Sequence, residues 1–406
     1  MKILQVNAVY GIMSTGRTCL ELSDFLWNNG HECITFYGEC PGEWEHAVYM
    51  GSTLSHKIHA LSARICGDWG IGSWNATSKL LKFINKYSPD VVHLRNLHGN
   101  YVHLPMLLSY LAKYAIPVVI TLHDFMPMTG GCAHFTTNSC NNWTIGCLKC
   151  RHLHRGLDYL LWNRAADVYT SRKKLYTQLP RLGVLGVSEW TATIARRSPL
   201  FSNANYISHV YNWINFEIFK PHGKVADSKL RYKLDIGNRK MILGVSSGWG
   251  SSKGLDEFCR LAQMLGDEYR IVLVGNIPAN IKLPSNILSV GSTDSTQALA
   301  AYYSAADVFV HLSLQETFGK VIAEALACGT PAIVFNSTAS PELISPMTGI
   351  AVNPDDGIRG ISASIRTILN APTFYTADAC VAHARTNFNY SRNCSLQLSF
   401  YNQLLK

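Results

Sequence analysis

The sequence predicts an α/β protein with two domains of similar size, and three observations lead to this prediction. The chain opens with an apolar stretch, a glycine-containing loop, a helical pattern and a second apolar stretch, all within residues 2–37. The same alternation begins again near residue 241. The length of 406 residues exceeds the limit of about 250 to 300 at which a single core stops growing. We therefore expect two Rossmann-like domains with parallel sheets, over residues 1–205 and 206–389.

The first domain begins with a strand at residues 2–8, followed by a Gly/Ser turn that ends at Gly16. Residues 18–29 have helical spacing and are followed by Gly30, which ends the helix. Residues 30–37 then form the second strand. A glycine loop between a strand and a helix is by itself a weak indication of a phosphate-binding turn.

Further buried strands are expected at residues 89–94, 117–122 and 182–187. His123 and Asp124 directly follow the second of these. The carboxyl ends of parallel strands are where α/β folds bind ligands. His123 is therefore either a ligand-contacting residue, with Asp124 orienting its imidazole, or a hydrogen-bonded structural residue.

A cysteine-rich segment comes next, and it contains four thiols, Cys132, Cys140, Cys147 and Cys150, with His134, His152 and His154 nearby. In a protein expected to be cytosolic, such spacing favours a metal site over disulfides. Four thiolates suit tetrahedral zinc, and the closing C-x2-C has the usual chelate spacing. Four protein ligands would leave no open position, so this Zn²⁺ would be structural. Free buried thiols and redox chemistry are the alternatives.

The second domain repeats the pattern. A strand at 241–246 leads into a Gly/Ser loop that contains Lys253, and a helix occupies residues 255–265. The next strand, 269–274, ends at Gly275. A loop lysine is usually only solvated, so this loop by itself does not assign Lys253 a function.

The most informative stretch of the chain runs from 307 to 331. An apolar strand is followed by a polar turn and then by a helix that Gly329 and Pro331 end. Glu316 lies before the helix, and Glu324 lies about two turns into it. The free N–H groups at the helix start form an anion site. The residues that contribute them are Phe318, Gly319 and Lys320.

The sequence from Glu316 to Glu324, followed by Ala-Cys-Gly-Thr-Pro331, resembles the E-x7-E signature of retaining nucleotide-sugar glycosyltransferases of family 4. Residues 207–221 also resemble the connector between the two domains of that family. The resemblance implies the GT-B architecture, in which two Rossmann-like domains with parallel sheets face a central cleft. It also implies that the last helix, within 390–406, packs back on the N-terminal acceptor domain.

The resemblance further implies roles for single residues. Gly16 would lie near the donor diphosphate and the acceptor, and Gly275 and Glu324 would lie against the donor nucleotide. Lys253 would contact the donor diphosphate together with the helix start at Phe318, Gly319 and Lys320. Glu316 and His123 would contact the donor sugar, and Glu316, His123 and Lys253 form the expected catalytic set. Positive protein groups would take the place of a metal ion, so no cofactor is expected for catalysis.

The expected reaction is the transfer of a hexose, with retention, from a nucleoside diphosphate sugar to a carbohydrate or polyprenyl-diphosphate-linked oligosaccharide acceptor. The subtype resembles bacterial enzymes of O-antigen, capsule and colanic-acid synthesis. Three alternatives remain open: a GT-B nucleotide-sugar epimerase, an inverting transferase that uses Asp124 as its base, and a non-enzymatic scaffold stapled by the metal site.

Composition and charge indicate where in the cell the protein is expected and which classes of partner it is expected to bind. The chain is 47% hydrophobic without an apolar run of about 18 residues, and its N-terminus lacks signal-peptide features, so we expect a cytoplasmic protein. Residues 1–205 carry 19 Lys+Arg against 12 Asp+Glu, or +7, and the rest carry 17 against 15, or +2. This excess is either chance surface charge or an attraction to the inner membrane face or an anionic acceptor. Nucleic acid is not an expected partner, because the chain has no basic tail or RNP-like motif.

Overall fold

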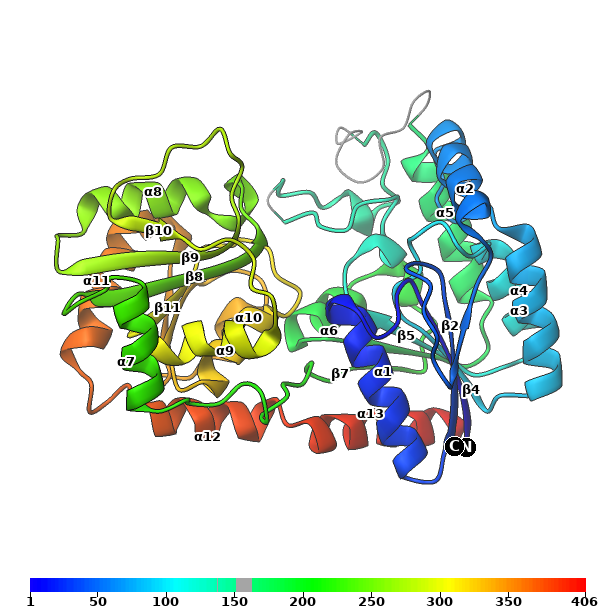
Figure 1. The fold of residues 1–406 in the computed structure, drawn as a ribbon. Helices are drawn as coiled ribbons and strands as arrows, with labels where there is room; N and C mark the ends of the chain where they lie inside the picture. The colour runs from blue at the N-terminus through cyan, green and yellow to red at the C-terminus, as the bar shows by residue number, and fades with distance from the viewer. Residues whose placement is uncertain (137, 151–162) are drawn as a thin grey trace. The chain divides into compact units, whose positions relative to one another are not determined.

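The computed structural model describes residues 1–136, 138–150 and 163–406, which form two compact units (Figure 1). The first unit contains Met1–Val210 and Ser391–Lys406, and the second contains Tyr211–Tyr390. The expected boundaries, 205/206 and 389/390, lie close to these. Each unit has its own parallel sheet covered by helices, so the predicted α/β class is confirmed.

The first unit contains a seven-stranded parallel sheet in the order β3-β2-β1-β4-β5-β6-β7. Its strands are β1 Lys2–Asn7, β2 Glu32–Tyr37, β3 Ala47–Tyr49, β4 Val91–Leu94, β5 Val118–Leu122, β6 Leu182–Gly186 and β7 Tyr206–His209. Every residue of β4, β5 and β6 is buried, as expected for parallel strands covered on both faces. The strand order reverses between β1 and β4, so the loops after these strands lie at the ligand-binding edge of the sheet.

The helices of the first unit are α1 Met13–Asn28, α2 Thr53–Cys66, α3 Trp74–Tyr87, α4 Leu104–Lys113, α5 Ala165–Thr177, α6 Glu189–Arg196 and α13 Tyr390–Leu405. The last helix packs on this sheet. The hydroxyl of Tyr401 lies 2.7 Å from Nδ1 of His93 in β4. A Cβ at Gly183 in β6 would lie 2.6 Å from a ring carbon of Phe400, so the glycine lets the helix approach the strand closely.

Helix α1 begins five residues before the expected start, so Gly16 lies inside the helix and not in a loop. The carbonyl of Gly16 accepts a hydrogen bond from the N–H of Gly11 at 3.0 Å, which closes the turn between β1 and α1. Gly16 is buried, and a Cβ there would lie 3.1 Å from Cγ2 of Val9. The glycine therefore allows the helix to approach the end of β1, a packing role that the loop prediction had not included.

The second unit contains a six-stranded parallel sheet in the order β10-β9-β8-β11-β12-β13. Its strands are β8 Lys240–Gly248, β9 Tyr269–Asn276, β10 Ile287–Ser289, β11 Val308–His311, β12 Ala332–Phe335 and β13 Gly349–Val352. Its helices are α7 Lys224–Lys233, α8 Leu255–Met264, α9 Thr296–Ala305, α10 Lys320–Ala327, α11 Gly357–Asn370 and α12 Ala377–Asn387. The strand order reverses between β8 and β11, so the loops after these two strands lie together at the ligand-binding edge.

Among the described residues, no helix has both the length and the apolar character needed to cross a membrane.

Candidate functional site

The second unit brings a lysine, a histidine and a glutamate together at the reversal point of its sheet. Nζ of Lys253 donates to Oε1 of Glu316 at 2.7 Å, and Nε2 of His311 lies 3.2 Å from the same oxygen. Burial alone would raise the pKa of Glu316, but the hydrogen bond and charge of His311 and the ion pair with Lys253 outweigh it and hold that pKa well below its ordinary range. Glu316 is therefore a carboxylate at every pH near neutrality.

The loop that carries Glu316 is fixed through its backbone. The N–H of Glu316 donates to Oγ1 of Thr338 at 3.0 Å, and its carbonyl accepts the N–H of Ala339 at 3.3 Å. Both partners follow β12, the neighbouring strand. The loops at the ends of β11 and β12 therefore hold the carboxylate in place before any ligand binds.

Lys253 reaches Glu316 because of the glycine that follows it. Ser251–Lys253 form a short 3₁₀ turn after β8, and Gly254 adopts φ +78° before α8 begins. A Cβ at Gly254 would lie 2.5 Å from Cβ of Leu312, at the end of β11. Only glycine suits both the backbone conformation and the close approach of these two loops.

Helix α10 begins next to Glu316, with Gly319 as its N-cap at φ +87°. The expected start was Phe318, two residues earlier than the observed Lys320. The side chain of Phe318 is buried against Tyr211 and Phe388, with ring centroids 6.0 and 5.6 Å apart. Its ring is thus part of the packing of the second unit, and anion binding by the N–H groups of the first helical turn stays a prediction.

Glu324 is buried in α10, where its Oε2 accepts a hydrogen bond from the hydroxyl of Tyr303 in α9 at 3.1 Å. Burial, with the nearby Glu324 carboxylate, raises the pKa of Tyr303 well above its ordinary value, so the phenol keeps its proton. The sequence did not identify Tyr303 as a site residue, because an aromatic residue at helical spacing looks like an ordinary core residue.

Gly275 is the second-last residue of β9 and has φ +117°, and its N–H donates to the carbonyl of Gly291 at 2.6 Å. A Cβ there would lie 1.6 Å from the carbonyl oxygen of Ser246. The indole of Trp249 donates to the carbonyl of Val274 at 3.0 Å. Glycine is therefore required at position 275 by its close approach to Ser246 in β8, and its expected contact with the nucleotide stays a prediction.

In the first unit, His123 follows β5 as expected and is half-buried. Burial, together with the charge of Arg95, lowers the pKa of His123 to about 3, so its ring is neutral at neutral pH. Asp124 accepts a hydrogen bond from Nε2 of His98 at 2.6 Å and another from the N–H of Met126 at 2.8 Å. His98 is the imidazole that these contacts join to Asp124, whereas the sequence pattern had suggested His123 for that pairing.

Two histidines that no sequence motif singled out, His98 and His311, lie in these sites. His311 is the last residue of β11, and His98 lies in the loop after β4. Both positions are at the carboxyl ends of parallel strands, which is the rule that identified His123. Applied to every strand, the same rule finds all three.

The four cysteines of the predicted zinc site lie in one region of the first unit. Burial and the nearby thiols Cys150 and Cys140 raise the pKa of Cys132 to about 11, and the Cys147 thiol, whose pKa is raised to about 12 mainly by burial, accepts the N–H of Gly130 at 3.2 Å. Outside residues 137 and 151–162, no three His, Cys, Asp or Glu side chains are arranged to hold a metal ion. His152 and His154 lie outside the described residues. The structural zinc therefore stays a prediction.

Comparison with known proteins identifies the family. Residues 15–217 match the model "Glycosyltransferase Family 4", and residues 239–371 match "Glycosyl transferases group 1". A GDP-mannose-dependent alpha-mannosyltransferase of Mycolicibacterium smegmatis is 29% identical over 345 residues, which cover 83% of this chain and 80% of the relative.

Solved structures agree on the fold. HepE of Anabaena in complex with UDP and glucose has a TM-score of 0.66 at 15% identity, covering 99% of this chain and 100% of HepE. WaaG, a glycosyltransferase involved in lipopolysaccharide biosynthesis, has a TM-score of 0.62 at 13% identity, covering 99% of both chains. The expected GT-B class is confirmed, and the chain belongs to glycosyltransferase family 4.

Proposed function

We propose that this glycosyltransferase moves a hexose from a nucleoside diphosphate sugar to a carbohydrate or polyprenyl-diphosphate-linked glycan, with retention of anomeric configuration. The observation that carries the proposal is the half-buried Glu316 carboxylate, held by Lys253 and His311 next to the start of α10. The negative charge of Glu316 thus lies beside two positive features, the Lys253 ammonium and the N-terminus of α10. A donor with a cationic reacting centre and an anionic leaving group needs both the negative and the positive charge.

Lys253 is the residue that would move on binding. A donor diphosphate would take Nζ of Lys253 from Glu316 and would also receive the N–H groups at the start of α10, with Lys320 nearby. These positive groups stabilise the charge that develops on the leaving diphosphate, so we propose that the reaction needs no metal ion. Glu316, released from Lys253, would hold sugar hydroxyls and the oxocarbenium-like centre.

Glu324 and His123 would position the rest of the donor. The carboxylate of Glu324, oriented by the Tyr303 hydroxyl, would accept hydrogen bonds from the ribose hydroxyls. Neutral His123 would exchange hydrogen bonds with a sugar hydroxyl. The leaving phosphate would deprotonate the acceptor, so no side-chain nucleophile is required.

The donor class is supported by the relatives, whose names specify GDP-mannose, and by HepE, which was solved with UDP and glucose. WaaG acts in lipopolysaccharide biosynthesis, which supports an acceptor in bacterial surface polysaccharide, including O-antigen and capsule types. The proposed acceptor is therefore a growing lipid-linked glycan.

The test is a calorimetric screen of UDP, GDP, ADP and their sugars with wild-type protein, Lys253→Ala and Glu324→Ala. Glu217→Gln, at an exposed carboxylate of the same unit, is the control. We expect one of the nucleotides to bind to the wild-type protein and to bind equally well to Glu217→Gln. The same nucleotide should bind weakly or not at all to Lys253→Ala and Glu324→Ala. NMR of the product then gives its anomeric configuration. An inverted product, or conversion of the donor without acceptor, would overturn the proposal in favour of an inverting transferase or an epimerase.

A further inference from the structure

Helix α2 of the first unit exposes most of its large aliphatic side chains. Its buried positions are His59 and Ala63, while its outward face is apolar. The exposed apolar side chains are Leu54, Ile58, Leu61 and Ile65, with exposed fractions of 67, 60, 55 and 42%. At about 100° per residue these four positions fall within an arc of about 60°, so they form one continuous row. We call these four residues the apolar row.

Basic side chains flank the apolar row. Lys57 and Arg64 are exposed on α2, and by helical spacing both lie on the same side of the row. On helix α3, Lys79 lines a pocket that Ile58 of the row also lines, and Lys82 and Lys86 lie further along the same helix. Neither helix contains an aspartate or a glutamate, so the two helices carry five positive side chains and no negative one.

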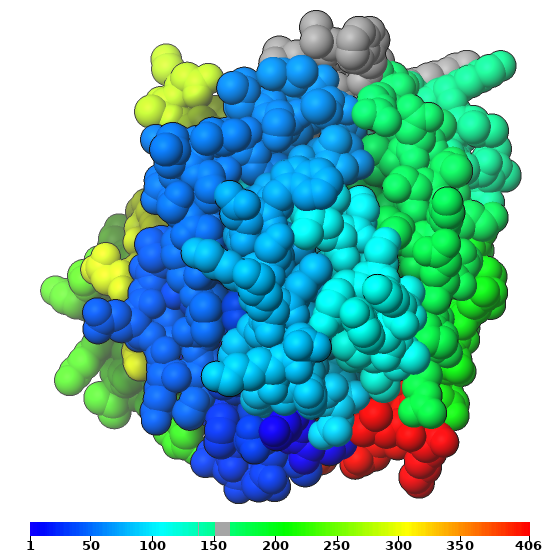
Figure 2. Space-filling model, turned by 90° about the vertical axis from the view of Figure 1, so that its right-hand side faces the viewer, coloured from blue at the N-terminus to red at the C-terminus, as the bar shows by residue number. Residues whose placement is uncertain are grey.

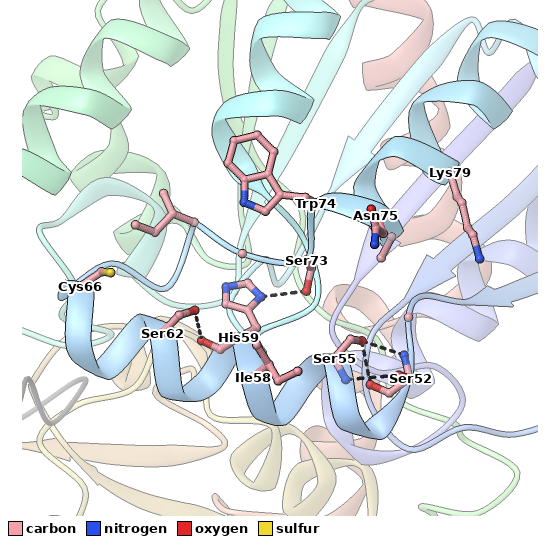
Figure 3. Close-up of a pocket in the computed structure, with 14 residues that line it drawn as sticks. Ser52, Ser55, Ile58, His59, Ser62, Cys66, Ser73, Trp74, Asn75 and Lys79 are labelled. Atoms are coloured by element: carbon pink, nitrogen blue, oxygen red, sulfur yellow. Dashed lines mark hydrogen bonds between the residues drawn. The ribbon is translucent and has the colours of Figure 1, made fainter.

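A pocket lies beside the apolar row. It has a volume of about 760 Å³, and Ile58 of the row and Trp74 and Lys79 of α3 are among the residues that line it (Figure 3). Trp74 is 60% exposed, with its ring packed on His103 at 3.9 Å between centroids. His59 also lines this pocket, and its Nδ1 lies 2.9 Å from Oγ of Ser73 (Figure 3). This hydrogen bond fixes the position of the imidazole.

This combination is costly for a surface that faces only water. An outward row of large aliphatic side chains usually marks an interaction site, and its occupant has to satisfy the positive flank as well. A lipid surface with negative headgroups does both, because its acyl region receives the apolar row and its phosphates receive the lysines and arginine. An exposed tryptophan is the aromatic residue typical of such interfaces.

We infer that the face formed by α2 and the start of α3, seen in the blue-to-cyan part of Figure 2, docks on an anionic membrane surface. The apolar row enters the headgroup region, Lys57 and Arg64 pair with lipid phosphates, and one lipid occupies the pocket between Ile58, Trp74 and Lys79. This surface is separate from the donor-binding residues of the second unit, so docking does not depend on the proposed reaction.

The experiment is flotation of the full chain with vesicles of phosphatidylcholine, with and without phosphatidylglycerol. We expect binding only to the anionic vesicles. Leu61→Ser/Ile65→Ser and Lys57→Gln/Arg64→Gln should each lower the partition coefficient by about tenfold or more, since each buried or paired side chain contributes several-fold. The matched control is Val225→Ser/Tyr232→Ser on α7, which is also basic and exposes these two residues by 73 and 89%. The control should bind like wild type.

Thermal midpoints and turnover with a water-soluble acceptor show that each variant is folded and that the donor site is intact. Equal binding to neutral and anionic vesicles, or anionic binding that both double variants retain, would overturn the inference. Sedimentation velocity provides a further check. A dimer that dissociates in Leu61→Ser/Ile65→Ser would assign the apolar row to a second copy of the chain instead.

Discussion

Nζ of Lys253 and Oε1 of Glu316 lie 2.7 Å apart, although 63 positions separate them in the sequence. The two residues that the proposed mechanism assigns to opposite charges of the donor are thus paired with each other. The pair keeps the site close to neutral, and the loop that carries each residue is held by a neighbouring strand. In the proposed mechanism, donor binding separates the pair, so the energy of the ion pair is part of the binding equilibrium.

The first prediction concerns Glu316→Gln. Without the carboxylate, Lys253 no longer has to leave a partner before it binds a diphosphate, and one negative charge is removed from the site. We expect a free nucleoside diphosphate to bind at least as tightly as to wild type, while turnover falls by about 10² to 10³ because a group that stabilises the transition state is lost. Calorimetry and a coupled assay measure the two quantities. Weaker nucleotide binding by this variant would contradict the proposed exchange of partners.

The second prediction concerns Lys253→Ala, which should have the opposite effect on binding. A charge-assisted hydrogen bond to phosphate is worth about 1.5 to 3 kcal/mol, so nucleotide affinity should fall by about tenfold to a hundredfold. The affinity of the variant should also depend less on salt concentration. Lys220→Ala, at an exposed lysine of the same unit, is the control and should bind like wild type.

Local sequence patterns predict the strands and helices and two glutamates of the candidate site. The other residues of the site are identified only by contacts between distant parts of the chain. Apolar runs and helical spacing locate β11 and α10, and the family signature identifies Glu316 and Glu324. No local pattern shows that His311 meets Glu316, that Tyr303 meets Glu324, or that His98 engages Asp124. The contacts of His311 and His98 form where the parallel sheet brings strand ends and loops together, and the contact of Tyr303 forms where α9 packs against α10.

The start of α1 shows a second reason for a wrong prediction. Gly16 and the polar residues before it are poor helix formers, so the pattern favoured a turn. The structure begins the helix at Met13, because packing on the end of β1 and the hydrogen bond from Gly11 to Gly16 outweigh that weak local preference. Tertiary packing decides such boundaries.

The third prediction is a pH dependence of stability from His123. Its pKa is lowered to about 3 in the folded protein, whereas an unfolded histidine binds a proton near pH 6.5. Between these values the unfolded state binds more protons, so stability is lost as pH falls below about 6.5, by at most about 1.4 kcal/mol per pH unit. His123→Gln should lose less stability than wild type between neutral and mildly acidic pH, measured by denaturant unfolding. His222→Gln, at an exposed histidine, should follow wild type; parallel curves for wild type and His123→Gln would show that His123 is not the group responsible.

The fourth prediction concerns the cysteine segment. If Cys132, Cys140, Cys147 and Cys150 bind a structural ion, the purified protein should contain about one zinc per chain. Cys147→Ser and Cys150→Ser should lose the metal and lower the thermal midpoint, while Cys40→Ser, at an exposed cysteine, should keep both. Metal analysis and thiol titration measure this. Four thiols that react freely in metal-free native protein would favour the alternative of free cysteines.

The last prediction tests how the site is held together. Gly254 has φ +78°, and a Cβ there would lie 2.5 Å from Cβ of Leu312. Gly254→Ala should therefore cost about 1 to 3 kcal/mol of unfolding free energy, from backbone strain and from the contact with Leu312. Gly237→Ala is the matched control, since Gly237 also has positive φ, +59°, but a Cβ there would meet nothing within 4 Å.

The two alanine variants separate strain from contact. Gly237→Ala should cost only the strain of the backbone, about 1 kcal/mol, and leave nucleotide binding unchanged. Gly254→Ala should in addition push the Lys253 turn away from the end of β11, which lengthens the distance to Glu316 and weakens nucleotide binding. Equal losses of stability and equal nucleotide affinities in the two variants would show that the close approach of Gly254 to Leu312 does not position Lys253.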